Sequence, residues 1–496
     1  MEIIGSLILS LTQSILFYGK QIGISMLIFE LICNGIILFV LNKKEKIQNK
    51  AGLWLMVPIV LLSSTYFIFA NRTFYVANIF VIFALNFIMY VILTNSKGTL
   101  TNYLYKTGLL FTDTVGEWQD GLKLSKEVVN EHLSVKKKTV NFKKIAKSVL
   151  IVCVVVGIVL ILLSSADSIF ANLFSGIGRI FTHINTANIF NLILRIVIMV
   201  MVYFLFLSFI LKVQDEFEED EYRREVEVKD TFTIKMLLAT LNIVYLVFCF
   251  IQIQSLFAKI NIQDSFDYAN YARSGFFQLM FVSFINLAVI LISNRYNAKK
   301  EKNIKILNLM LVVFTIIIAI SSMYRMHMYE MEYGLTYLRM FVYIILITEI
   351  IAFIPIVKYI LDDKFDFMKW CFGICIGAYC VANIMNIENI IVSRNLTRES
   401  IRSIDYNYLS NIASEDSYII LEDKLQDQNI DLKEETAIEN ILINIKKNEK
   451  TLSWQEFNIQ KYKIRNKIIK IKKIGKPTKK RSRFLLWKIL ENIVIE

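Results

Sequence analysis

The chain has 496 residues, of which 55% are hydrophobic and 20% are charged, and its mean hydropathy is +0.50. This composition is too apolar for a series of soluble domains, and it indicates an integral membrane protein. The formal net charge of +13 is concentrated in particular loops and in the C-terminal tail. That placement favours membrane orientation and contact with anionic lipid over nucleic-acid binding. We therefore expect the lipid bilayer as a partner and no nucleic acid.

The N-terminal segment, residues 1–20, lacks the basic start and the small-residue cleavage site of a secretory signal. We predict an amphipathic or interfacial helix there, and an additional span is the alternative.

A membrane-spanning helix needs about twenty mainly apolar residues. Ten segments within residues 21–386 meet this requirement and are too long for barrel strands, so a helical bundle follows. The predicted fold class is all-α, a polytopic transmembrane bundle of about ten spans with a small helical C-terminal domain. The spans are predicted at approximately residues 21–41, 52–70, 74–94, 145–165, 188–211, 233–257, 275–294, 305–323, 337–360 and 368–386.

Basic residues in short loops set the orientation of these spans, because loops rich in lysine and arginine stay in the cytoplasm. Lys43 and Lys44 follow the first span, and Lys136, Lys137 and Lys138 belong to the loop after the third. Those two loops, and the loops after the fifth and seventh spans, are predicted to face the cytoplasm. The loops between them are poor in basic residues and are predicted to face outward.

Beyond the tenth span the chain becomes polar and basic with a helical pattern, which predicts a C-terminal domain over residues 387–496. The span count places this tail outside, whereas its positive charge favours the inside. Because long segments cross membranes largely regardless of charge, we predict the outward position. The basic loops and the tail are the segments expected to contact anionic lipid.

Three predicted outward segments, residues 164–174, 266–279 and 324–339, place polar and aromatic side chains at helix ends. An interfacial aromatic belt accounts for any single one of these residues. Their charged residues share one face, however, and opposite charges at a low-dielectric boundary attract strongly. The segments therefore predict either a clasp that locks helix ends together or a ligand-binding vestibule. The charged members are Asp167, Asp267, Arg273, Arg325, Glu330, Glu332 and Arg339.

Within the spans, Glu30, Arg195 and Glu349 are the most costly residues to bury, and such residues are candidates for function. We predict that Arg195 pairs with Glu349 or Glu30, either as a functional site or as a structural contact. Polar amides in spans commonly form hydrogen bonds between helices. That role is predicted for Asn86, Asn242, Asn286 and Gln252.

Signatures of catalysis are missing: the chain has no HExxH, CxxC, GxSxG or P-loop motif. His327 and Glu330 stand one helical turn apart, but a metal needs two further ligands that the sequence does not indicate. We therefore expect no catalytic residues, no metal and no cofactor, and we favour a protein that is not an enzyme.

Five blocks of the chain resemble the bacterial multi-pass membrane family named domain of unknown function 4173. The blocks are SSADSIFANLF, FDYANYARSGFFQLMFVSFINLAVI, MYRMHMYEMEYGLTYLRMFV, IENIIVSRNLTRESIRSIDYNYLSNIASED and LSWQEFNIQKYKIR. The resemblance implies a membrane architecture without an established activity, and it adds Tyr333, Thr336, Arg394 and Asn395 to the candidate residues. The candidate outer-face site is then Asp167, Asp267, Tyr268, Tyr271, Arg273, Arg325, Tyr333, Thr336, Arg339, Arg394 and Asn395.

These observations predict a protein of the bacterial cytoplasmic membrane with a polar site at its outer face. We expect a sensor, a scaffold or a partner-binding protein of the cell envelope. The alternative is a transporter or lipid-handling protein that uses Glu30, Arg195 and Glu349. An enzyme acting on lipid or envelope intermediates at the outer interface is the third possibility.

Cysteine labelling of intact cells tests the predicted orientation. Single cysteines placed in the tail or in the loop of residues 324–336 should react with a membrane-impermeant maleimide, because both segments are predicted to lie outside. A cysteine in the loop of residues 43–50 should react only after the cells are permeabilised. The reverse pattern would contradict the orientation.

Overall fold

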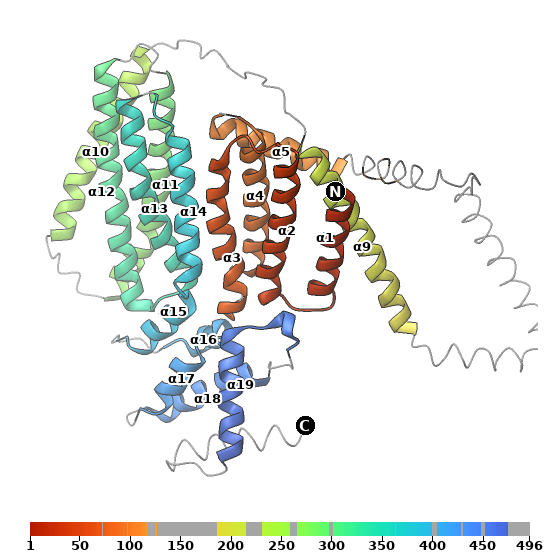
Figure 1. The fold of residues 1–496 in the computed structure, drawn as a ribbon. Coiled ribbons are helices and arrows are strands. Elements are labelled where there is room, and N and C mark those ends of the chain that lie inside the picture. The colour runs from red at the N-terminus through yellow and green to blue at the C-terminus, as the bar shows by residue number, and fades with distance from the viewer. Residues whose placement is uncertain are drawn as a thin grey trace, which may run out of the picture. The chain divides into compact units, whose positions relative to one another are not determined.

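The structure is a computed structural model that describes residues 1–71, 73–96, 98–116, 121, 123, 125, 186–214, 231–257, 265–296, 301–362, 364–398, 404–427, 430–447 and 452–474. Side chains are described for these residues except 186–190, 253–276, 447 and 468–474. Every regular element in the described chain is a helix (Figure 1), which confirms the all-α fold class.

Nine helices of the described chain are long and apolar enough to cross a membrane. They correspond to nine of the ten predicted spans, and the remaining one, residues 145–165, lies outside the described residues. The nine are α2 (Ile24–Lys43), η1 with α3 (Lys50–Leu55 and Met56–Ile68), α4 (Tyr75–Thr94), α9 (Thr186–Lys212), α10 (Thr231–Phe257), α11 (Ser265–Tyr296), α12 (Lys302–Tyr333), α13 (Tyr337–Leu361) and α14 (Phe367–Ile384).

The chain forms two compact units, and the first contains residues 1–20, 31–48 and 106–216. In this unit α1 (Glu2–Phe17) packs along α9 in the antiparallel direction, since Gly5 approaches Ile210 while the Tyr18 hydroxyl donates to the Asn191 carbonyl at 2.6 Å. Sixteen residues of helix measure about 24 Å. Glu2–Phe17 is shorter than the candidate spans, and both the interfacial helix and the additional span stay predictions for this segment.

A further difference concerns the predicted cytoplasmic loop after α4, which contains the amphipathic helix α5 (Leu100–Gly116). One face of α5 is buried at Tyr103 and Leu110, while Tyr105 and Phe111 remain exposed. The many lysines of this loop predict a cytoplasmic position. The helical period of its apolar residues is less conspicuous in the sequence than this charge.

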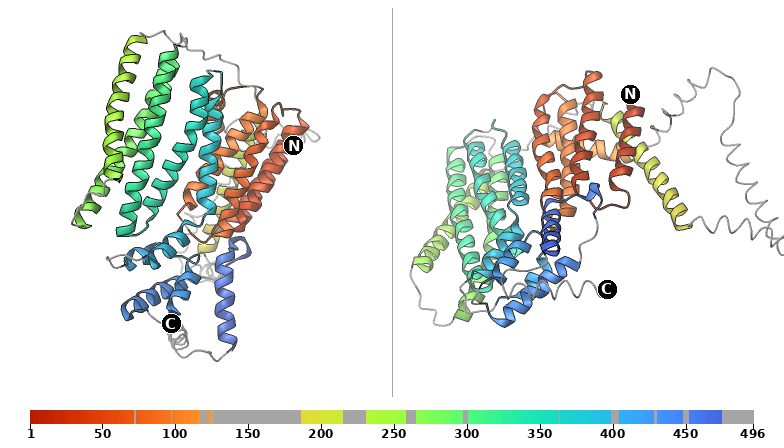
Figure 2. Two further views of the ribbon diagram at one scale, coloured as in Figure 1. Left: turned by 90° about the vertical axis from the view of Figure 1, so that its left-hand side faces the viewer. Right: turned by 60° about the horizontal axis from the view of Figure 1, so that its bottom comes forward.

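The second unit contains residues 21–30, 49–105 and 217–496, and therefore both the remaining spans and the tail. In it α12 packs against α10, α11 and α13, and the series continues through α14 and α3 to α4 (Figures 1 and 2). Leu238, Ile290, Leu311 and Phe353 form part of the fully buried core between α10, α11, α12 and α13. Apolar burial thus holds these helices side by side.

Hydrogen bonds between helices join the four amides for which the sequence predicted that role. Asn86 donates to Glu30 at 2.8 Å, and Asn242 donates to the Leu307 carbonyl at 3.1 Å. The Tyr245 hydroxyl donates to Asn286 at 2.7 Å, and the Ser321 hydroxyl donates to Gln252 at 3.0 Å. The prediction of interhelical hydrogen bonding is confirmed.

The tail is a set of short helices at one end of α12, α13 and α14, as both views in Figure 2 show. Its core contains the buried residues Leu409, Leu421, Ile438 and Ile441. The elements are α15 (Ile387–Leu396), α16 (Tyr406–Ile412), α17 (Tyr418–Leu425), α18 (Leu432–Lys447), η2 (Trp454–Glu456) and α19 (Ile459–Ile474). The helical tail of the prediction is present, and residues 475–496 lie outside the described chain.

Two turns bring α12, α13 and α15 to the same place. Gly334 ends α12 with a φ of 81°, and Thr336 begins α13 by accepting a hydrogen bond from the Arg339 amide at 3.4 Å. Asn386 turns the chain from α14 into α15 with a φ of 47°, and its side chain accepts from the Asn389 amide. Asparagine tolerates this left-handed conformation better than most residues.

Candidate functional site

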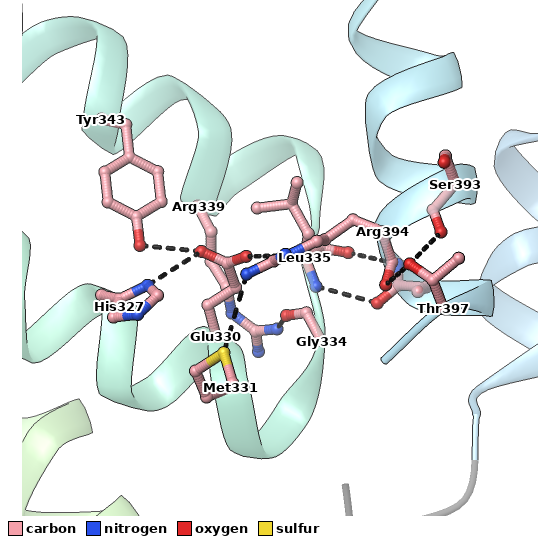
Figure 3. Close-up of polar contacts among 11 residues, drawn as sticks. His327, Glu330, Met331, Gly334, Leu335, Arg339, Tyr343, Ser393, Arg394 and Thr397 are labelled. Atoms are coloured by element: carbon pink, nitrogen blue, oxygen red, sulfur yellow. Dashed lines mark hydrogen bonds and ion pairs between the residues drawn. The ribbon is translucent and has the colours of Figure 1, made fainter. Parts of the chain in front are cut away.

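A buried glutamate lies at the centre of the helix ends beneath the tail (Figure 3). Glu330, 7% exposed, accepts a hydrogen bond from the Tyr343 hydroxyl at 2.9 Å and another from Arg394 Nε at 3.3 Å. His327 Nδ1 lies 3.9 Å from the same carboxylate. Glu330 therefore joins α12, α13 and α15 through one side chain.

Side chains of the tail and of α13 satisfy the carbonyls at the end of α12. Arg398 donates to the Glu332 carbonyl at 3.1 Å, and Arg339 donates to the Gly334 carbonyl. The Asn395 amide pairs with both backbone groups of Leu335, accepting at 2.9 Å and donating at 2.8 Å. The last carbonyls of a helix have no partner within the helix, and cations are favourable there. This cap ties the tail to the α12–α13 turn.

The turn requires glycine at position 334 for two reasons. Its positive φ is unfavourable for other residues, and a Cβ atom there would clash with the Asn395 side-chain oxygen. Glycine thus permits the close approach of α15. Arg339 has a second contact, since its guanidinium lies 4.3 Å from the centre of the Tyr329 ring.

The tail also binds the end of α3. Asp416, 4% exposed, accepts hydrogen bonds from the backbone amides of Ala70 at 2.9 Å and Asn71 at 3.0 Å. Asn458 donates to the carbonyls of Tyr66 at 3.1 Å and Phe69 at 2.7 Å. A carboxylate and an amide from the tail therefore satisfy backbone donors and acceptors that would otherwise be left without partners.

Glu388 organises the tail from inside. This carboxylate is 1% exposed and accepts from the Ser414 amide at 2.6 Å, the Ser414 hydroxyl at 2.7 Å and the Ser417 hydroxyl at 2.7 Å. Burial raises the pKa of Glu388 to about 7, although these hydrogen bonds oppose the rise. Burial likewise raises the pKa of Asp416 to about 6, against the hydrogen bonds from Ala70 and Asn71.

The start of α2 is held by the segment before α19. The Ile24 amide donates to the Phe457 carbonyl at 3.1 Å, and the Gln21 amide donates to Glu456 at 2.7 Å. A Cβ atom at Gly23 would lie 2.6 Å from the Glu456 carbonyl carbon. Position 23 therefore needs glycine for the two chain segments to meet.

These contacts surround a cavity of about 760 Å³, which we name the tail cavity. Its walls carry the basic residues Lys461 and Arg465 and the aromatic residues Trp454 and Tyr462. Trp454 is 59% exposed and Tyr462 is 53% exposed. A smaller cavity of about 370 Å³ shares Gln21, Asn71, Asn458 and Lys461 with it and reaches the amides Asn78 and Asn383 between α4 and α14. Cations, amides and aromatic rings thus face one hollow.

The structure brings together part of the predicted outer-face site. Thr336, Arg339, Arg394 and Asn395 meet at the α12–α13 turn, and the Tyr333 ring packs on Tyr329 at 4.7 Å between ring centres. Arg325 is half-buried on α12. Asp267, Tyr268, Tyr271 and Arg273 lie in the first part of α11, where the structure describes the backbone alone, and Asp167 lies outside the described residues.

The three intramembrane residues have other contacts than a shared ion pair. Arg195 donates to the Ser14 hydroxyl at 2.8 Å and lies 5.5 Å from the centre of the Tyr18 ring. Glu30 accepts from Asn86, and Glu349 accepts from the Ser283 hydroxyl at 2.9 Å. The pairing of Arg195 with a glutamate stays a prediction. Within the described chain no three histidine, cysteine, aspartate or glutamate side chains are placed to hold a metal.

Sequence reasoning missed the buried polar residues of the tail, Glu388, Asp416 and Asn458. All three occur in blocks that carry the resemblance, but the residues predicted from these blocks were Arg394 and Asn395. One signal was available for Asn458: it precedes an apolar helical pattern, a position where asparagine caps helices. Glu388 and Asp416 have no such signal, because solvated and buried carboxylates look alike in a sequence.

The nine spans and the helix-end site define a multi-pass helical membrane protein. A family model described as a domain of unknown function (DUF4153) matches residues 56–423, and the chain belongs to this family. The expectation of a family of unknown function is confirmed, but the number 4173 was wrong, since the matching family is 4153. No curated protein and no solved structure matches the chain.

Removal of the Asn395 side chain tests the cap on α12. Asn395→Ala leaves two buried backbone groups of Leu335 without partners, so we expect a loss of about 1–3 kcal/mol in the free energy of unfolding. The measurement is the thermal midpoint in detergent. Gly334→Ala should lower it as well, while Ser393→Ala, at an exposed position of the same helix, should leave it unchanged. Equal midpoints for Asn395→Ala and Ser393→Ala would contradict the cap.

The buried carboxylates predict a pH dependence of stability. A pKa that is raised on folding adds stability below the unfolded value and loses it as the pH rises through the folded value. With folded pKa values of about 7 for Glu388 and about 6 for Asp416, the thermal midpoint should be higher at pH 5 than at pH 8. Glu388→Gln should reduce this difference, whereas Asp423→Asn, exposed on α17, should preserve it. A midpoint that rises between pH 5 and pH 8 would disprove the expectation.

Proposed function

We propose that the chain is a sensor, scaffold or partner-binding protein of the bacterial cytoplasmic membrane that recognises its ligand or partner at the tail cavity, on the outer face. The observation that carries this proposal is the docking of the tail. Side chains of the tail bind the ends of α3 and α12, and the segment before α19 binds the start of α2, around a hollow of about 760 Å³. Binding sites are commonly concave, with a few convergent polar groups.

The lining of the cavity favours an anionic, hydroxyl-rich ligand. Lys461 and Arg465 supply positive charge against the single acidic side chain Glu415. Trp454 and Tyr462 expose flat aromatic rings. A sugar ring or another apolar surface can pack on such rings. Asn71 adds an amide that both donates and accepts. Because no triad or metal-ligand set accompanies these groups in the described chain, we favour recognition over catalysis.

A second candidate function, transport or lipid handling, has one observation in its favour. Glu349 is 6% exposed, and its Oε1 atom is buried with no hydrogen-bond partner among the described residues. A buried carboxylate with an unsatisfied oxygen is costly and marks a functional site by default. The tail cavity and its smaller neighbour are lined by other residues, so the two functions predict sensitivity at different positions.

Complementation of a strain that lacks the chain separates the two functions. The readout is the transcript profile of the strain relative to its parent. We expect the double variant Trp454→Ala, Arg465→Gln to fail to restore the parental profile, because it removes a ring and a charge from the cavity while both side chains are exposed. We expect Glu349→Gln to restore it.

Lys463→Gln is the matched control, since Lys463 is exposed on α19 and lies outside the cavity lining. Thermal midpoints in detergent establish that each variant is folded. Restoration by the cavity variant together with failure of Glu349→Gln would contradict the recognition proposal and favour transport.

A further inference from the structure

A second hollow, which we name the α12–α13 groove, lies on the membrane-spanning surface. It has a volume of about 820 Å³, and aliphatic side chains form its walls, including Ile320 and Met323 of α12 and Ile347, Ile350 and Ile351 of α13. Ile347 is 45% exposed and Ile351 is 43% exposed. Both helices are candidate spans, so exposed side chains between them are expected to face the hydrocarbon of the bilayer.

The groove has the depth of one leaflet. At a rise of 1.5 Å per residue, the part of α12 from Ile320 to Glu330 is about 15 Å long. The hydrocarbon core of a bilayer is about 30 Å thick. A chain that begins at Glu330 and runs along the groove would therefore extend for about half the thickness of the hydrocarbon core.

The groove ends at the charged cluster of Figure 3. His327, Glu330, Tyr343 and Arg394 line this end, while the rest of the lining is almost entirely apolar. The Arg394 side chain is 52% exposed. Its Nε atom donates to Glu330 and its Nη2 atom to the Met331 sulfur, and Nη1 has no hydrogen-bond partner among the described residues. Arginine can thus hold Glu330 and still offer donors to a bound anion.

The polar end of the groove holds one guanidinium, Arg394, one carboxylate, Glu330, and the His327 imidazole. Glu330 and Glu332 are the acidic residues of the α12 end. The arginines Arg325, Arg339, Arg394 and Arg398 lie on α12, α13 and α15 and just after α15. Arg339 and Arg398 bind backbone carbonyls beside this end, so Arg394 is the guanidinium of the lining that can meet an anion, and the attraction is strongest near the low-dielectric boundary.

We propose that the α12–α13 groove binds one acyl chain of an anionic phospholipid whose phosphate lies against Arg394 and His327. The apolar walls match the chain, the length matches one leaflet, and the Arg394 donor that Glu330 leaves available selects the phosphate. This lipid site is separate from the tail cavity and does not depend on the function proposed for it. It also differs from the general attraction of basic loops for anionic lipid, because it requires the groove.

Native mass spectrometry of the full chain tests the proposal. The detergent-purified protein is titrated with phosphatidylglycerol and, separately, with phosphatidylcholine that carries the same acyl chains. Both headgroups offer a phosphate, but choline adds a cation that Arg394 repels, so we expect phosphatidylglycerol to bind about tenfold more tightly. Arg394→Gln should abolish this preference, and Arg394→Lys should retain part of it.

Ile347→Trp fills the groove and should weaken the binding of both lipids. Its matched control is Ile354→Trp, because Ile354 is 69% exposed on the same helix and lies outside the groove lining. Binding by Ile347→Trp that equals binding by Ile354→Trp overturns the proposal, whatever the Arg394 variants show. Equal binding of the two lipids by the unmodified chain overturns the selection of the headgroup.

Discussion

Backbone groups at the ends of membrane-spanning helices need hydrogen-bond partners, and in this protein the tail provides them. The carbonyls after the last turn of α12 bind Arg398 and Asn395, and the amides and carbonyls at the end of α3 bind Asp416 and Asn458. A buried backbone group without a partner costs about 1–3 kcal/mol. The tail therefore acts as part of the bundle, which explains why the two form one compact unit.

Most contacts between the tail and the membrane-spanning helices are hydrogen bonds to backbone groups. The sequence suggested a clasp of opposite charges, and Arg394 with Glu330 is one such pair. Half of the Arg394 side chain is exposed, however, and exposed ion pairs contribute little to stability. Asp416 is buried more deeply, and it binds the backbone amide hydrogens of Ala70 and Asn71 instead of a cation. The strength of the interface thus depends on complete hydrogen bonding more than on net charge.

Hydropathy predicted the spans because the bilayer demands long apolar helices, and nine of the ten predicted segments are helices of the expected length. The amides Asn86, Asn242, Asn286 and Gln252 were predictable for the same reason, since a polar group in a span needs a neighbour. The partners in the helix-end site were not predictable. Glu330 was predicted as a charged residue of the outward segment. Its contact with Arg394 joins residues that are distant in the sequence, and local sequence patterns do not predict such pairs. The helix α5 was not predicted, because the lysines of its loop made charge the most conspicuous feature of the segment.

The contact between Asn458 and the Phe69 carbonyl joins residues 389 positions apart. At a synthesis rate of about 5–20 residues per second, the end of α3 exists for roughly 20–80 s before its partner leaves the ribosome. During that interval the carbonyls at the end of α3 lack the hydrogen bonds that Asn458 later donates. A chain truncated before residue 458 would leave the carbonyls of Tyr66 and Phe69 without these hydrogen bonds. Asn458, at the start of α19, therefore completes the hydrogen bonding at the end of α3 only late in synthesis.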